Sequence, residues 1–428
     1  MVTADTEKRT ASSRFTGPRP AKAVAIASLI VLACSYVVNA MDRQVFPVLL
    51  PGIRSDFHFS LSQGGLLATI FTLGIGVAGL PTGYLMDRMS RKSVILLGIV
   101  IYSVFTVLTA LATGFADMFA YRTFSGVGEA MQNAALFSAV GAYFISNRSL
   151  AIGTLNCSYG LGGFLGPLIG TALAGGKTGW RVPFWTFGLI GIGFAVLVAV
   201  FIRKSFTERE DSAGATGPAL LTDHVPAILF NRNVLLLGLT AVVVGISMYG
   251  YIGLYPTFLE TKLHFSTGHA SLAASMFGLG ALLGIPAGWL GDRFNQRVVM
   301  LVPILVGSVI GYLLFNGPVT AGPQYVLSFA EGAVASGFLF VNIYSGMQHS
   351  VRPNAIGRVS GVFVAAFYIP AAFAGYLFSA LVKSAGWGGA GIWQLTVLPL
   401  IGAAALLFID TGQMCHVVAA GRTTSRHE

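Results

Sequence analysis

The amino-acid sequence predicts an all-α membrane protein with twelve transmembrane helices in two pseudo-symmetric six-helix bundles. Three observations carry this prediction: an apolar composition, twelve apolar segments of spanning length, and a repeat between the two halves. Of 428 residues, 54% are hydrophobic and 10% are charged, whereas soluble domains have about 25% charged residues. The 54 glycines suit the close helix packing that is common in lipid.

A window of about 20 apolar residues per crossing finds the twelve segments. The first six predict an N-terminal bundle over residues 22–203, and the last six predict a C-terminal bundle over 232–411. We expect polar segments to flank and join the bundles: an N-terminal tail (1–21), a linker (204–231) and a C-terminal tail (412–428). The predicted spans are 22–50, 64–85, 93–113, 117–143, 149–173, 184–202, 233–258, 270–290, 298–315, 323–347, 356–382 and 391–410.

Basic residues predict the orientation, because Lys and Arg are retained on the cytoplasmic side of a membrane. With both termini in the cytoplasm, the cytoplasmic segments hold 19 of the 26 basic residues and the outer loops hold five. We therefore expect a multi-pass protein of the cell inner membrane with both termini cytoplasmic. The net charge of +10 lies in short breaks between spans and not on one soluble face, so it does not indicate nucleic-acid binding.

The two halves repeat each other in sequence. GYLMDRMSRK begins at Gly83 and GWLGDRFNQR begins at Gly288, and their aspartates, Asp87 and Asp292, are 205 residues apart. A second pair of segments, RSLAIG and RPNAIG, has an offset of 204 residues. Parallel repeats around a central cavity are typical of secondary transporters.

Motifs in the first third of the chain resemble those of a known transporter family. The pattern G-x-x-x-D-R-x-x-R-K between spans two and three resembles the signature loop of the major facilitator superfamily. More narrowly, YVVNAMDRQVFPVLLPGIRSDF, GYLMDRMSRK and RTFSGVGEA together resemble the Spinster family of that superfamily. The resemblance implies the major facilitator fold, alternating access through one central cavity, and lipid-derived amphipathic substrates.

Charged side chains are costly inside a membrane and therefore mark functional positions. Arg122 and Glu129 are seven residues apart on span four, so they share a helix face about 10 Å apart along the axis. The resemblance implies that spans one and four line the central cavity, where Asp42 and Arg43 of span one would meet them. These four charges sum to zero. The ionisable side chains expected well within spans are Asp42, Arg43, Arg122, Glu129 and Glu331.

The four charges of the first half predict proton coupling. A buried carboxylate stays ionised beside an arginine and takes up a proton when the arginine moves away. We expect Glu129, near mid-membrane, to carry the proton, with Asp42 as the second candidate. Arg43 or Arg122 would pair with a carboxylate in one state and with an anionic substrate group in the other, since arginine offers bidentate hydrogen bonds to such groups. The alternative is a fixed salt-bridge network that holds spans one and four together.

Charged residues at the predicted cytoplasmic helix ends form a second candidate site. The resemblance implies a gate latch, in which contacts between the halves hold the outward-facing state. The alternative is that the basic residues only fix the topology. The candidate latch residues are Asp87, Arg88, Arg91, Lys92, Asp292 and Arg293.

The second half offers aromatic and amide side chains in place of paired charges. Phe338 and Asn342 are four residues apart on span ten and share a face. If this half lines the cavity, one wall of the pocket is charged and the other is aromatic, which suits an amphipathic molecule with a charged head. The alternative is that the aromatic residues only pack, and that Glu331 is a buried protonated acid. The candidate pocket residues are Glu331, Asn342, Phe338, Tyr249, Tyr344 and Tyr368.

Together these features predict a proton-coupled secondary active transporter that moves an amphipathic, lipid-like or anionic small molecule by alternating access, as a monomer. Span five contains GGFLGPLIG, which resembles an element found in antiporters of the superfamily, so export by proton antiport is favoured. The alternatives are proton-coupled uptake of a small organic anion or sugar, and a uniporter. An enzyme or a channel is the competing class. The sequence contains no P-loop, H-E-x-x-H or G-x-S-x-G motif, so we expect no catalytic residue, cofactor or metal.

Overall fold

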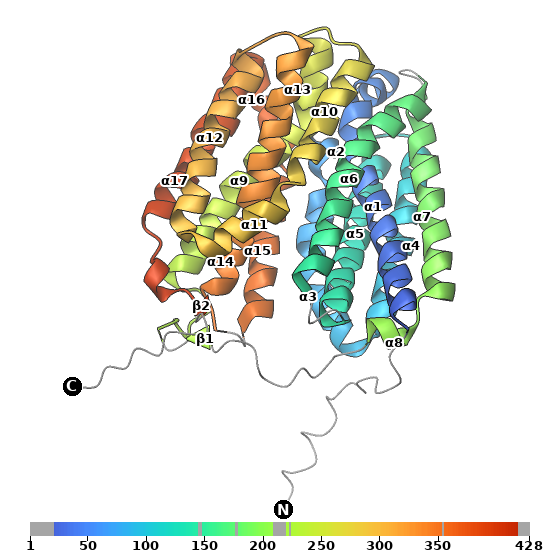
Figure 1. The fold of residues 1–428 in the computed structure, drawn as a ribbon. Helices are drawn as coiled ribbons and strands as arrows, with labels where there is room; N and C mark the ends of the chain where they lie inside the picture. Colours follow the sequence, from blue (N-terminus) through green and yellow to red (C-terminus); the bar gives the residue numbers. More distant parts are fainter. Residues whose placement is uncertain are drawn as a thin grey trace, which may run out of the picture.

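The computed structural model of the chain consists almost wholly of helices, arranged in two bundles that lie side by side (Figure 1). It describes residues 21–143, 148–175, 179–208, 220–221, 224–352 and 355–417. Most of the predicted N-terminal tail, the central part of the predicted linker and the last eleven residues of the predicted C-terminal tail lie outside the described residues. The side chains of Asp87 and Asp292 also lie outside this description.

The N-terminal bundle contains the first six crossings. Its first helix, α1 (Lys22–Phe57), extends seven residues beyond the predicted span and contains Pro47 and Pro51. Predicted span two is broken at Ile70 into two helices. The other helices of this bundle are α2 (Leu61–Thr69), α3 (Phe71–Arg88), α4 (Arg91–Ala110), α5 (Phe115–Tyr143), α6 (Arg148–Ala174) and α7 (Arg181–Phe201).

The C-terminal bundle is more interrupted than the sequence predicted. Span eight is two helices, and span ten contains a π-helix, η2. Gly386 interrupts α16 with a φ of 73°, a left-handed conformation that glycine adopts without steric cost. The elements are α9 (Arg232–Thr261), α10 (Thr267–Ala281), α11 (Gly284–Arg293), α12 (Gln296–Asn316), α13 (Ala321–Glu331), η2 (Gly332–Phe340), α14 (Val341–His349), α15 (Ile356–Ala371), α16 (Ala374–Gly391), η4 (Ile392–Val397) and α17 (Leu398–Leu407), followed by a short 3₁₀ turn, η5 (Thr411–Gln413).

Twelve crossings are present, as the sequence predicted. Ten helical segments of the described residues are long and apolar enough to span a membrane. One of them, Ile356–Leu407, has 52 residues and turns at Gly386, so it covers predicted spans eleven and twelve. The remaining crossing is α5, which is less apolar because it carries Arg122, Glu129 and amide side chains.

A short two-stranded sheet, which the sequence did not predict, ties the linker to the C-terminal tail. β1 (Leu220–Leu221) pairs antiparallel with β2 (His416–Val417). Beside it, the imidazole Nε2 of His224 lies 2.8 Å from the carbonyl oxygen of Met414. The sheet and α8 (Lys204–Thr207) lie at one end of the molecule, which we call the linker end; the opposite end is the far end (Figure 1).

The two bundles meet most extensively at four helix pairs: α1 with α9, α2 with α16, α3 with α15, and α6 with α10. Glycines let the helices of the two bundles approach closely. Gly65 of α2, for example, lies directly against Gly375 of α16. Thr69 Oγ1 donates a hydrogen bond to the Ala372 carbonyl at 2.8 Å and accepts one from the Gly375 N–H at 3.3 Å. In Figure 1 the two bundles lie close together toward the far end and diverge toward the linker end. The contact of α2 with α16 thus closes the far end.

A side chain at position 65 should open this contact. A Cβ there would overlap the carbonyl group of Gly375, and such overpacking costs about 1–3 kcal/mol. We expect Gly65→Val to shift the population toward a state open at the far end. In a cysteine-free background, a cysteine at Val48, which is 1% exposed, should then react about tenfold faster with a membrane-impermeant thiol reagent. Gly193→Val on α7, where a Cβ meets open space, is the control, and an equal increase in both variants would contradict this account.

Candidate functional site

The four embedded charges of the N-terminal bundle form one buried cluster, which we call the charge cluster. The ion pairs cross between two helices: Arg43 Nε of α1 lies 2.6 Å from Glu129 Oε2 of α5, and Arg122 Nη1 of α5 lies 3.2 Å from Asp42 Oδ2 of α1. Asp42, Arg122 and Glu129 are 0% exposed, and Arg43 is 2% exposed. The structure therefore brings these four residues into contact; their role in proton coupling stays a prediction.

Hydroxyl groups connect the two ion pairs. Ser125 Oγ lies 3.3 Å from Asp42 Oδ2 and 3.1 Å from Glu129 Oε1, and Thr106 Oγ1 donates to Asp42 Oδ2 at 3.0 Å. A serine hydroxyl has a single proton, so Ser125 donates to one carboxylate at a time. Whether it donates to Asp42 or to Glu129 depends on which of the two is ionised. Ser125 was not predicted from the sequence, although it stands three residues after Arg122 and four before Glu129, which places it on the same helix face.

The hydrogen bonds of the charge cluster are incomplete. Arg43 Nη2, Arg122 Nη2 and Asp42 Oδ1 are buried without a hydrogen-bond partner among the described residues. Arg43 Nε lies close to Glu129 Oε2, but the two atoms are not aligned for a hydrogen bond. Their contact is therefore an ion pair without a hydrogen bond. Buried donors without acceptors are costly. An incoming anion would therefore find unused guanidinium donors.

The two arginines have different surroundings. The guanidinium carbon of Arg122 lies 5.0 Å from the ring centroid of Phe46 and 5.3 Å from that of Phe71, so cation–π contacts enclose it. Arg43, in contrast, interacts electrostatically with Tyr249 and Tyr368 of the C-terminal bundle. Arg43 thus lies within electrostatic range of two tyrosines of the opposite bundle.

Aromatic side chains of the C-terminal bundle lie opposite the charge cluster. The ring centroid of Tyr249 is 5.9 Å from that of Phe71 in the N-terminal bundle and 6.0 Å from that of Tyr368. Tyr344 continues this aromatic group through Phe363, at 4.9 Å. Three of the six candidate pocket residues therefore belong to one aromatic wall, and two of them, Tyr249 and Tyr368, lie within electrostatic range of Arg43.

The other three candidate pocket residues are not part of this wall. The amide nitrogen of Asn342 donates to the carbonyl oxygens of Ala287, at 3.3 Å, and Phe338, at 2.9 Å. The Asn342 side chain therefore braces α14 against α11, and Phe338 stands half-buried on η2. Glu331 is buried on α13, where Tyr251 interacts with it electrostatically.

Two predicted latch residues make contacts within their own bundle. Arg91 Nη1 donates to the Thr207 carbonyl at 3.3 Å, and Lys92 Nζ donates to the Ala199 carbonyl at 2.7 Å. Both contacts connect the start of α4 to α7 and α8.

The sequence repeat between the two halves is visible in the structure at two candidate latch residues, Arg88 and Arg293. The guanidinium carbon of Arg88 lies 4.2 Å from the ring centroid of Tyr84, and that of Arg293 lies 4.1 Å from that of Trp289. Each arginine stacks on the residue four positions earlier in its own helix. The two latch aspartates have side chains outside the described residues, so a latch between the bundles stays a prediction.

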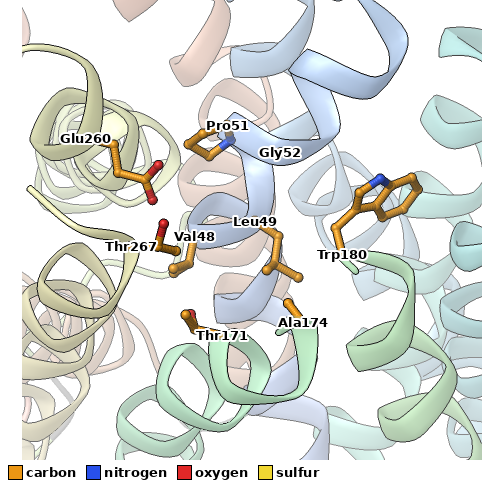
Figure 2. Close-up of a pocket in the computed structure, with 9 residues that line it drawn as sticks. All are labelled: Val48, Leu49, Pro51, Gly52, Thr171, Ala174, Trp180, Glu260 and Thr267. Atoms are coloured by element: carbon orange, nitrogen blue, oxygen red, sulfur yellow. The ribbon is translucent and has the colours of Figure 1, made fainter. Parts of the chain in front are cut away.

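A cavity that the sequence did not predict lies at the far end. It has a volume of about 60 Å³ and is lined by α1, α6, α9 and α10, so it touches both bundles. In Figure 2 the carboxyl group of Glu260 and the hydroxyl group of Thr267 lie beside Val48 at this cavity, with Trp180 on its other side. The cavity is separate from the charge cluster, none of whose residues line it.

Comparisons with known proteins agree with this architecture. The family model of the Major Facilitator Superfamily matches residues 32–375 and 242–414. A hexuronate transporter of Bacillus subtilis (strain 168) is 25% identical over 351 residues, which are 78% of this chain and 82% of the relative. Protein spinster of Drosophila melanogaster is 25% identical over 307 residues, which are 69% of this chain and 50% of the relative.

A solved structure shares the fold. It is that of a bacterial homologue of the human lysosomal transporter Spinster in an inward-facing and occupied conformation, with a TM-score of 0.69 and 20% identity over 92% of this chain and 96% of that chain. These findings confirm the resemblance to Spinster proteins and the expectation of a transporter rather than an enzyme. The chain belongs to the Major Facilitator Superfamily of membrane transporters.

Proposed function

We propose that the protein is a proton-coupled secondary active transporter that moves an anionic small molecule with an apolar body by alternating access. The observation that carries this proposal is the position of Arg43, which pairs with Glu129 at 2.6 Å and lies within electrostatic range of Tyr249 and Tyr368 of the other bundle. An anion between the bundles would meet a guanidinium group on one side and aromatic rings on the other. We place the linker end in the cytoplasm, following the distribution of Lys and Arg.

Coupling to protons follows from competition for Arg43. An anion that binds Arg43 takes the counter-ion of Glu129, and a buried carboxylate without a counter-ion takes up a proton. Anion binding and protonation of Glu129 therefore favour each other, and the linkage is reciprocal. Two ligands that bind together also cross together, so this geometry supports proton symport of an organic anion. The similarity to a hexuronate transporter supports the same substrate class.

Export of a lipid-like anion by proton antiport is the second candidate. The span-five glycines that favoured it in the sequence pack against α1 near the charge cluster, because Gly162 and Gly166 of α6 lie against the backbone around Met41. Movement of α6 would thus act directly on Asp42. The aromatic wall and the similarity to Spinster proteins also suit an acyl chain.

A proton-flux measurement separates the two candidates. The purified protein is placed in liposomes with a pH-sensitive dye inside, and glucuronate or lysophosphatidylglycerol is added outside. Symport predicts internal acidification with glucuronate, whereas antiport predicts internal alkalinisation with the lysolipid. Arg43→Ala should remove either signal, and Arg181→Ala, which breaks an exposed pair with Asp56, should not. Uptake of either probe, labelled with a radioisotope, without any proton flux would refute proton coupling.

A further inference from the structure

Buried hydrogen bonds join α9 to α13 in the C-terminal bundle. The hydroxyl of Tyr255 donates to Gln324 Oε1 at 2.8 Å, and Tyr251 Oη lies 2.7 Å from Ser328 Oγ. Ser328 donates its own proton to the Ala273 carbonyl, so Tyr251 is the donor to Ser328. The tyrosines are one helical turn apart on α9, and their partners are one turn apart on α13. We call this set the tyrosine ladder.

Glu331 is the next polar residue on the same buried face of α13 as Gln324 and Ser328. It is 5% exposed, and its Oε2 atom is buried without a hydrogen-bond partner among the described residues. Within the described part of the chain, no basic side chain interacts with it electrostatically. An ionised carboxylate is unstable in such surroundings, whereas a neutral carboxylic acid is tolerated. These surroundings therefore favour the neutral, protonated form of Glu331.

The titratable groups around Glu331 are few. Tyr251 of α9 is the one that interacts with it. On α10, His269 bonds the hydroxyl of Tyr325, six residues before Glu331 on α13, and is exposed. From α12 and η2, no described group is resolved as interacting with Glu331. Its charge state thus depends on access to water.

The helix changes its geometry directly after Glu331. The π-helix η2 covers Gly332–Phe340, although π-helices are rare and mostly a single turn, and they occur frequently at functional sites. At its start, Gly332 lies directly against the backbone of Phe277 in α10. A shift of η2 into regular α-helix would turn the segment after Glu331 relative to α10 and change the surroundings of the carboxyl group.

One cavity lies at the far end, and a second borders the tyrosine ladder. The first is the cavity of about 60 Å³ beside Glu260 (Figure 2). The second, of about 10 Å³, is lined by Tyr251 and Tyr255, and Val48 lines both. One water molecule needs about 10–15 Å³ of such volume, so the first cavity has room for several and the second for one. The second cavity thus has room for one water molecule beside Tyr251.

We infer that Glu331 is a second proton-binding site, located in the C-terminal bundle and filled from the far end through the two cavities and the Tyr251–Ser328 hydrogen bond. Loading passes a proton from cavity water to Tyr251, which hands its own proton to Ser328. Ser328 delivers a proton to the carboxylate when its hydroxyl turns from the Ala273 carbonyl toward Glu331, three residues further along α13, and release reverses the path. The binding of this proton stands on the geometry alone. Its use as a second coupling proton rests on the proposed function.

Infrared difference spectroscopy tests the site without a substrate. The full-length protein in vesicles of phosphatidylcholine and phosphatidylglycerol is brought from neutral to alkaline buffer, and the carbonyl stretch of protonated carboxylic acids is followed. Wild type, Glu129→Gln and Glu260→Gln should share a band that Glu331→Gln lacks, and Glu331→Asp should shift that band. If Glu331→Gln keeps every band of the wild type, the inference is wrong.

Exchange of the same band in D₂O tests the route. Tyr251→Phe removes one relay hydroxyl and should slow the exchange about tenfold, the effect of a barrier raised by about 1.4 kcal/mol. Tyr376→Phe, at an exposed tyrosine of α16, is the control and should exchange at the wild-type rate. Equal rates in all three proteins would refute the route. Absence of proton flux in the liposome assay together with a normal Glu331 band would refute the proposed coupling and leave the proton site standing.

Discussion

Glu129→Gln is expected to abolish proton-driven accumulation and to preserve counterflow exchange. Glutamine keeps the size of the side chain and its contact with Ser125, but it cannot take up or release a proton. It also mimics protonated Glu129 and no longer competes for Arg43. Binding of an anionic probe such as glucuronate should therefore tighten, by about tenfold if roughly 1.4 kcal/mol of competition is removed. Accumulation under a pH gradient and exchange of labelled glucuronate at equal pH are the two measurements.

The control for this prediction is a carboxylate of different length. Glu129→Asp retains a titratable group and should keep a proton-driven component, even if its rate falls. Parallel loss of accumulation and exchange in Glu129→Gln would instead assign the charge cluster a bracing role between α1 and α5. That was the alternative predicted from the sequence.

Arg122→Leu should be the most destabilising single change in the charge cluster. It leaves Asp42 buried at 0% exposure without its counter-ion, and breaking a buried pair costs about 3–5 kcal/mol. The double variant Asp42→Asn with Arg122→Leu removes both charges and should recover most of the loss. Arg181→Leu breaks the exposed pair with Asp56 and should cost about 0–1 kcal/mol. Thermal unfolding of the four proteins in detergent ranks them, and a double variant no better than Arg122→Leu would contradict the pairing.

Hydropathy predicted the crossings well because twenty apolar residues in a row have few alternatives in a folded protein. It was insensitive to local geometry. The breaks at Ile70 and before Gly284, and the π-helix after Glu331, lie inside apolar runs whose composition does not change. The extra turns of α1, which reach Phe57, were missed for the opposite reason, since the run becomes polar before the helix ends.

The charge cluster was predictable because an ionisable side chain inside a membrane is rare and conspicuous. Which arginine meets which carboxylate was not, because the pairing depends on the rotation of α1 against α5. The prediction for Asn342 shows the same limit: the helix face was identified, but α11 rather than a cavity lies opposite it. Ser125 and the tyrosine ladder contain only neutral groups, which do not stand out in a sequence until their neighbours are known.

The charge balance of the cluster determines how the transporter would respond to voltage. Its two arginines and two carboxylates cancel, so an anion with one negative charge that crosses with the proton of Glu129 moves no net charge. Its accumulation would follow the pH gradient and ignore the membrane potential. If the proton of Glu331 crosses as well, each cycle carries one positive charge, and the potential contributes about 2.3 kcal/mol per 100 mV. Accumulation measured at a membrane potential set with valinomycin and potassium therefore shows whether one proton or two cross with each anion.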